Sequence, residues 1–247
     1  MKKLWMTGLM GMALAIQCSA LTVSVSRVTG YWEGAGGEFN IANAGNPTDP
    51  AFLAELSHFN SNPSTATIVT GPNGLGFETF CNSGFVELQN NPQNGTFTPN
   101  NVAWGAAWLY NEFATGGLAA YGYDYSTTGS GGTSFANRAA AAYALQNAIW
   151  ELDGTGGSYL NPTAAGINLF LTAAANAGMA MYGTSFSDTS AANGAFDVYE
   201  LYLTYNGVPS QPMLGFGVPV PDGGSTIILL GMALTGIGLF SRRFVRG

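Results

Sequence analysis

Lysine is missing from most of this 247-residue chain, and charge of either sign is scarce. Charged residues make up 9% of the sequence, and its only lysines are Lys2 and Lys3. The interval 21–217 keeps two arginines against thirteen carboxylates, a formal charge of −11. Such a surface repels phosphate backbones and anionic lipid, so nucleic-acid binding is excluded.

Histidine and cysteine are also scarce, which removes the parts of several common active sites. His58 is the only histidine, and without a second histidine or a cysteine cluster neither a zinc site nor a Ser/His/Asp triad has its residues. The Asp153–Gly157 run lacks the alternating oxygen ligands and final glutamate of a calcium loop, and the chain has no P-loop. We therefore expect the chain to bind no metal or cofactor and to have no enzymatic activity. A hydrolase is the least favoured of the hypotheses considered.

The N-terminal residues 1–20 have the pattern of a cleavable signal peptide. Lys2 and Lys3 precede an apolar run, and Cys18-Ser19-Ala20 supplies the small residues that signal peptidase needs. Gln17 is a poor fit to a lipoprotein site, so simple cleavage after Ala20 is favoured. That cleavage removes Cys18 and leaves Cys81 alone in an exported chain, where cysteines are normally paired.

The exported interval 21–217 predicts one α+β domain, with a β-sandwich or barrel-like sheet and a helical subdomain. Alternation of apolar and polar residues indicates strands, and apolar residues at helical spacing indicate helices. A Gly/Asn-rich loop is expected after the first strand, and Asn100 or Asn101 is expected to cap the second helix. The predicted elements are a strand at 21–32, a helix at 50–59, two strands around a turn at 82–84 within 77–88, helices at 102–115 and 134–153, a helix from Asn161-Pro162 to about 178–182, and a last strand at 195–206.

The helix predicted at 134–153 is the most informative stretch of the domain. Ser134 is its candidate N-cap, its interior is rich in alanine, and Gly154 follows its last residue. Leu145 and Ile149 belong to its apolar stripe, which places Gln146 at the edge of the buried face.

The C-terminal residues 218–247 form a separate three-part segment. The motif Val220-Pro221-Asp222-Gly223-Gly224-Ser225 precedes an apolar run at 227–240, and Arg242, Arg243 and Arg246 follow it. The run is a marginal transmembrane span, and its arginines are expected to stay cytoplasmic. A buried core helix is the less favoured alternative.

This segment resembles the PEP-CTERM family of sorting signals, in the variant that begins Val-Pro-Asp. The resemblance implies recognition by an exosortase-like transpeptidase in a Gram-negative-type envelope and a transient stay in the inner membrane. It further implies cleavage near the motif and delivery to the cell surface or the extracellular space.

Part of the exported domain resembles the thioester domains of bacterial surface adhesins. The matching elements are Phe80-Cys81, Trp108–Asn111 and the Leu145–Glu151 segment with its Gln-x-x-Ile-Trp pattern. The resemblance implies an internal thioester between Cys81 and Gln146. It departs from the family at Asn82-Ser83, where a hydrophobic-acidic pair is more usual, and in the short spacing between Cys81 and Gln146.

The formation of a thioester requires the fold to bring two side chains together and to shield the bond from water. A thiolate that attacks a carboxamide expels ammonia and stores an activated acyl group, which requires fixed proximity. Phe80 and Trp150 are candidate residues for shielding the bond from water. The absence of lysine from 21–217 fits a domain that must not consume its own acyl group, and it equally fits a charge-poor exported protein.

Two hypotheses follow from these observations. In the first, a surface adhesion domain captures an amine-bearing polymer or protein through Cys81 and Gln146. In the second, the domain is a non-catalytic structural or biofilm-matrix protein, in which Cys81 is a free buried thiol and Gln146 an ordinary buried amide.

Overall fold

A computed structural model gives the fold of the exported domain. It describes residues 21–33, 36–45, 50–59, 68–71, 74–84, 87–98, 102–125, 134–183, 185–186 and 195–217. The predicted signal peptide at 1–20 and the predicted sorting segment at 218–247 lie outside these residues.

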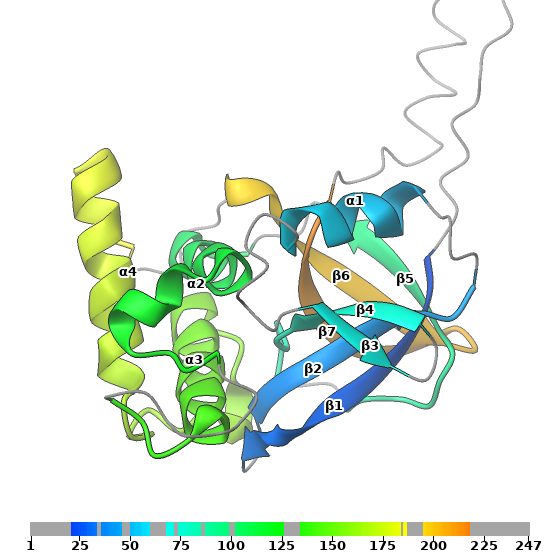
Figure 1. The fold of residues 1–247 in the computed structure, drawn as a ribbon, viewed down its shortest axis with the longest axis horizontal. Coiled ribbons are helices and arrows are strands. Elements are labelled where there is room, and N and C mark those ends of the chain that lie inside the picture. The colour runs from blue at the N-terminus through cyan, green and yellow to red at the C-terminus, as the bar shows by residue number, and fades with distance from the viewer. Residues whose placement is uncertain are drawn as a thin grey trace, which may run out of the picture.

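The described residues form one mixed domain, in which a layer of helices lies beside a curled antiparallel sheet (Figure 1). The sheet order is β3-β4-β2-β1-β5-β6-β7. The strands are β1 (Leu21–Glu33), β2 (Gly36–Asn43), β3 (Ile68–Gly71), β4 (Gly74–Thr79), β5 (Gln93–Thr98), β6 (Val198–Tyr205) and β7 (Val208–Phe216). The helices are α1 (Pro50–Phe59), α2 (Trp104–Thr115), α3 (Arg138–Asp153) and α4 (Ile167–Tyr182).

The sheet curls until the chain beyond β4 meets β7. Cys81 forms an isolated antiparallel bridge with Met213, flanked by hydrogen bonds from Leu214 N to Phe80 O (3.0 Å) and from Asn82 N to Pro212 O (2.8 Å). The predicted mixture of helices and sheet is therefore confirmed for the described residues, whose seven strands form one antiparallel sheet.

Helix α3 is the element that joins the helical layer to the sheet. It packs on β1 and β2 and also contacts α2 and α4. Its alanine-rich surface allows this close packing on several sides, and eleven of its residues are buried. Gln146 is completely buried, so its predicted place at the edge of the buried face is wrong.

Several predicted boundaries are wrong for local reasons. Asn137, not Ser134, caps α3, because its side chain accepts a hydrogen bond from Ala140 N at 2.8 Å. The N-cap of α2 is Ala103, which replaces the predicted caps at Asn100 and Asn101. Helix α4 begins at Ile167, after a left-handed Gly166, and not directly after Asn161-Pro162. Gly154 ends α3 in a left-handed conformation, as predicted.

The strand predictions missed part of the sheet. The Gly/Asn-rich segment after β1 is strand β2, and β3, β5 and β7 were not predicted either. The second strand expected after the 82–84 turn is wrong, since Glu87 and Leu88 have no regular structure. Strand β2 alternates polar and apolar residues only over Glu38–Ile41, and glycine and asparagine around this segment are typical of a loop.

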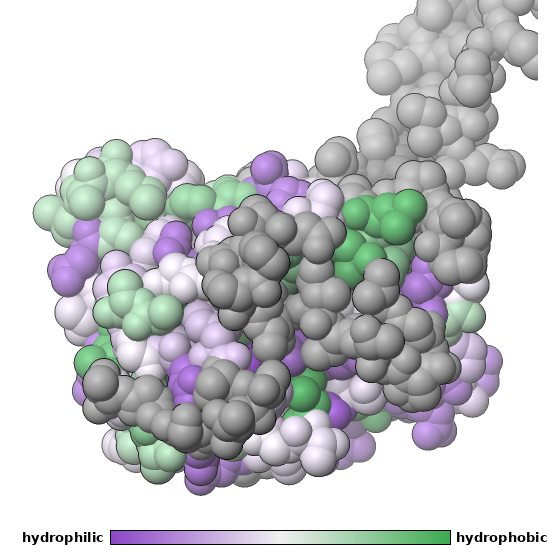
Figure 2. All heavy atoms as spheres, in the orientation of Figure 1, coloured by the Kyte–Doolittle hydropathy of each residue, from purple (hydrophilic) through white to green (hydrophobic). Residues whose placement is uncertain are grey.

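Exposed apolar side chains gather at the C-terminal end of α4. Met179, Met181 and Tyr182 are each more than half exposed, and Figure 2 shows apolar surface over this end of the helix. Elsewhere that face mixes polar and apolar residues. Within the described part of the chain, no helix has the length and apolar character needed to cross a membrane.

Candidate functional site

Cys81 and Gln146, which lie 65 positions apart in the sequence, meet in the fold. The backbone N–H of Cys81 donates to Oε1 of Gln146 at 2.9 Å, and Nε2 of Gln146 donates to the carbonyl oxygen of Cys81 at 2.8 Å. Both residues are completely buried. The carboxamide is thus held in one orientation against the backbone of the cysteine.

The side chain of Gln146 takes the place of a strand residue. Phe39 in β2 lies opposite Thr79 in β4, and this register continued would place Gly37 opposite Cys81. The described β2–β4 pairing ends at Phe39 and Thr79, and beyond it the carboxamide of Gln146 satisfies the backbone of Cys81. Because buried backbone polar groups need partners, this pairing has a structural role of its own.

The thiol of Cys81 is protonated in this environment. Burial raises its pKa well above the ordinary value, and the charge of Arg27 opposes this only in part. Cys81 is the free cysteine of the described residues. A protonated thiol in a dry site is a weak nucleophile, so any attack on Gln146 depends on proximity and on loss of the proton.

The two predicted shielding residues adjoin the pair from separate elements. Phe80 precedes Cys81 and packs edge-to-face on Phe113, with ring centroids 4.9 Å apart. Trp150 lies one helical turn after Gln146 on α3 and is also buried. Both side chains belong to the same continuous core as Cys81.

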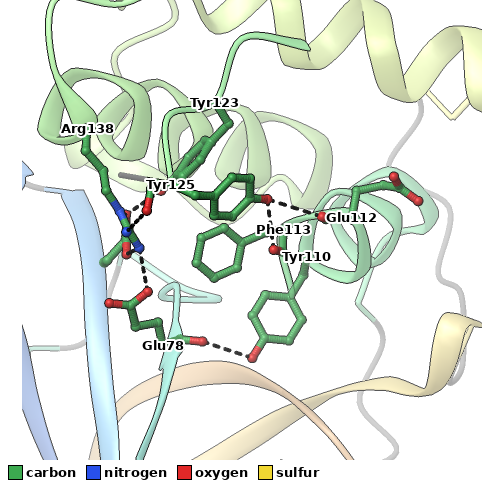
Figure 3. Close-up of polar contacts among 8 residues, drawn as sticks. Glu78, Tyr110, Glu112, Phe113, Tyr123, Tyr125 and Arg138 are labelled. Carbon is green, nitrogen blue, oxygen red and sulfur yellow. Dashed lines mark hydrogen bonds and ion pairs between the residues drawn. The ribbon is translucent and has the colours of Figure 1, made fainter. Parts of the chain in front are cut away.

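A buried ion-pair cluster fixes the start of α3, and sequence reasoning missed it. Arg138 donates to Glu38 through Nε (2.8 Å) and Nη2 (2.6 Å), and Nη2 also lies 2.6 Å from Oε2 of Glu78 (Figure 3). The hydroxyl of Tyr123 donates to Glu38 as well. The side chains of all three charged residues are fully buried. The cluster ties α3 to β2 and β4 two turns before Gln146.

The cluster holds one more carboxyl group than its single cation can neutralise. Burial, reinforced by the neighbouring charge of Glu38, raises the pKa of Glu78 well above its usual range, although Arg138 opposes the shift. Oε1 of Glu78 has no hydrogen-bond partner among the described residues. Burial and the second carboxylate thus favour the protonated form of Glu78. The sequence feature that could have indicated this buried ion-pair cluster is Arg138, an arginine on an otherwise uncharged, alanine-rich helix face.

The described residues hold no group of three or more His, Cys, Asp and Glu side chains placed to bind a metal ion. The predicted sorting residues Val220–Ser225, Arg242, Arg243 and Arg246 lie outside the described part of the chain.

Comparison with known proteins identifies the C-terminal segment. Residues 219–244 match the VPDSG-CTERM motif, a sorting motif of the PEP-CTERM type. The match contains Val220–Ser225, Arg242 and Arg243, and it ends before Arg246. No curated protein and no solved structure matches the chain. The resemblance to thioester domains therefore has no support from the comparisons and stays a prediction.

Proposed function

We propose that this chain is an exported, surface-sorted protein whose domain captures an amine-bearing partner through an internal thioester between Cys81 and Gln146. The C-terminal motif supports export and sorting to the surface. The paired hydrogen bonds between Gln146 and Cys81 support the thioester. Capture forms one bond per chain, so the domain acts as a binder and not as an enzyme.

The single observation that carries the thioester is the hydrogen bond from Cys81 N–H to Oε1 of Gln146, 2.9 Å long. Oε1 is the atom that gains negative charge when the thiol attacks the carboxamide carbon. A backbone N–H already pointed at that atom stabilises the developing charge, as donors of an oxyanion hole do. The residue that carries the thiol would thus also supply the donor.

The proposed reaction balances without any other reagent. The Cys81 sulfur forms a bond to the Gln146 side-chain carbonyl carbon, the carbon–nitrogen bond breaks, and the nitrogen leaves as ammonia with the proton from the thiol. An amine then attacks the same carbon, the carbon–sulfur bond breaks, and the Cys81 thiol is restored. The complete burial of both residues would protect the intermediate from water.

Delivery to the surface involves a transpeptidase and, transiently, the inner membrane. An exosortase-like transpeptidase recognises Val220–Ser225 and cleaves near it, while the apolar run at 227–240 holds the chain in the inner membrane with Arg242, Arg243 and Arg246 on the cytoplasmic side. The final partner is an amine-bearing surface polymer or protein.

Methylamine tests capture directly. The exported chain is incubated with methylamine and its intact mass is measured, beside Cys81→Ala and Gln146→Ala. The proposal predicts one stable methylamide on Gln146 in the natural chain and none in either variant. A natural chain whose mass never changes contradicts the thioester and leaves the sorting function standing.

Sorting has its own test. Replacing Pro221 and Asp222 by alanine should keep the chain in the inner membrane, whereas Thr96→Ala, at an exposed position of β5, should leave its release unchanged. Equal release of all three proteins would contradict recognition through the motif.

A second function is favoured by the same contact. The carboxamide of Gln146 already satisfies the backbone of Cys81, and burial keeps the thiol protonated, as a non-reactive structural or matrix domain requires. An unmodified Gln146 with a titratable thiol in the denatured chain supports this alternative.

A further inference from the structure

A polar cluster lies next to Cys81 and is not used by the thioester itself. Nδ2 of Asn82 donates to Oε2 of Glu200 in β6 at 2.8 Å. The carbonyl oxygen of Asn82 accepts a hydrogen bond from the hydroxyl of Thr155, which follows α3. Residues of three separate parts of the chain therefore converge on the position directly after the cysteine.

One acceptor in this cluster lacks a donor. Asn82 is 2% exposed, and its Oδ1 has no hydrogen-bond partner among the described residues. A buried amide oxygen without a partner is costly, because it has lost its water and gained nothing in return. This oxygen belongs to the same carboxamide that contacts Glu200, and the described residues supply no donor for it.

Asp153 adds a second carboxylate to the cluster. It lies at the end of α3, accepts a hydrogen bond from Ala103 N at 2.7 Å and interacts with the side chain of Thr155. Burial raises its pKa from 3.8 to about 6, with a smaller contribution from the charge of Glu200. Two carboxylates thus lie close enough to influence one another beside Asn82.

The positive charge that these groups favour is in short supply in the domain. No lysine lies in residues 21–217. Of the two arginines, Arg138 is bound by Glu38 and Glu78, and Arg27 stacks on the ring of Trp32 at 3.7 Å. A cation at the Asn82 cluster would therefore come from another molecule.

We infer that Asn82, Asp153 and Glu200 bind the protonated primary amine that the thioester captures. An ammonium group has three donors and no acceptor, and this cluster offers the amide oxygen of Asn82 and two carboxylates. The inference rests on the proposed thioester and names the site that selects its partner.

The cluster extends from partly exposed residues to the neighbour of Cys81. Glu200, Asp153 and Thr155 are half-buried, whereas Asn82 and Cys81 are buried. The negative charge of the domain raises the local concentration of cations. The ammonium group loses one proton to water at the carboxylates, its nitrogen bonds to the Gln146 carbonyl carbon, and the released Cys81 thiolate takes up a proton.

The test compares a charged with an uncharged nucleophile on the full exported chain. Methylamine is protonated near neutral pH and hydroxylamine is not, so only methylamine should need the carboxylates. In Glu200→Gln the rate of methylamide formation should fall about tenfold, the worth of one charge-assisted hydrogen bond, while the hydroxylamine rate stays within about twofold. Glu151→Gln, an exposed carboxylate on α3, is the matched control and should change neither rate.

Each outcome separates the two proposals. Equal rates for the natural chain and Glu200→Gln, or equal losses with both nucleophiles, overturn the amine site and leave the thioester standing. A natural chain that reacts with neither nucleophile and retains its ammonia overturns the thioester, and the amine site with it.

Discussion

Gly36 in β2 lies directly against the side chain of Gln146 in α3. A Cβ atom at position 36 would stand 2.6 Å from Cγ and 3.0 Å from Cβ of Gln146. Carbon atoms that are not bonded do not approach so closely, so the glycine is what allows the carboxamide to reach the backbone of Cys81. The atoms contacted are Cγ and Cβ of Gln146, and they cannot move without moving the amide of the same side chain.

Gly36→Ala should therefore displace Gln146. We expect the free energy of unfolding to fall by about 1–3 kcal/mol, as for other overpacked core positions, and methylamine incorporation to be lost. Urea denaturation measures the first effect and intact mass the second. Thr96→Ala on the exposed face of β5 is the control. An unchanged stability with full incorporation would show that Gln146 does not depend on this contact.

Gln146→Ala should be costly relative to a chain whose Gln146 carboxamide is intact. The substitution leaves the buried N–H and C=O groups of Cys81 without partners, at about 1–3 kcal/mol each, so we expect a loss of roughly 2–6 kcal/mol. Asn176→Ala removes an exposed amide from α4 and should stay within about 0.5 kcal/mol. Similar small losses in both variants would contradict the strand-like role of Gln146.

The two glutamates that contact Arg138 should respond differently to neutralisation. Glu38 accepts two hydrogen bonds from Arg138 and one from Tyr123, so Glu38→Gln leaves the guanidinium poorly paired in the core and should cost about 3–5 kcal/mol. Burial raises the pKa of Glu78 and favours its neutral form, which glutamine resembles, so Glu78→Gln should cost less than Glu38→Gln. Chemical denaturation of both variants checks this order, and the reverse order would show that Glu78 carries the charge.

Asp153 should make stability depend on pH. Its pKa is raised from 3.8 to about 6 on folding, so the folded state binds the proton more tightly than the unfolded state. The resulting stabilisation is fully present below about pH 4 and is lost as the pH rises through about 6, by roughly 3 kcal/mol for the full shift. The difference in unfolding free energy between the natural chain and Asp153→Asn, followed from about pH 4 to 7, isolates this group. A difference that does not change with pH would contradict the shifted pKa.

The elements that local sequence patterns could predict are those with one clear signal. The alternation in β1, the proline at the start of α1 and the glycine after α3 each depend on neighbouring residues. Strands β1 and β6 and all four helices were predicted near their observed positions. Strand β2 was missed because glycine and asparagine, which are depleted in strands and typical of loops, surround its short alternating segment Glu38–Ile41.

The candidate site was likewise predicted only in part from the sequence. Cys81 and Gln146 stood out by composition and by a short motif, and the fold places them in contact. The Arg138 cluster and the Asn82 cluster depend on contacts across 60 or more residues, between Arg138 and Glu78, Arg138 and Glu38, and Asn82 and Glu200. No local pattern records such contacts, because they are fixed by the register of the sheet and the packing of α3 upon it.

The intact mass of the denatured chain, recorded after alkylation with iodoacetamide, tests the central claim most directly. The account predicts a natural chain that lacks the mass of one ammonia and carries no alkyl group on Cys81, together with a Gln146→Ala variant that retains its full mass and is alkylated once. A natural chain of full mass with one alkylated thiol would contradict the thioester.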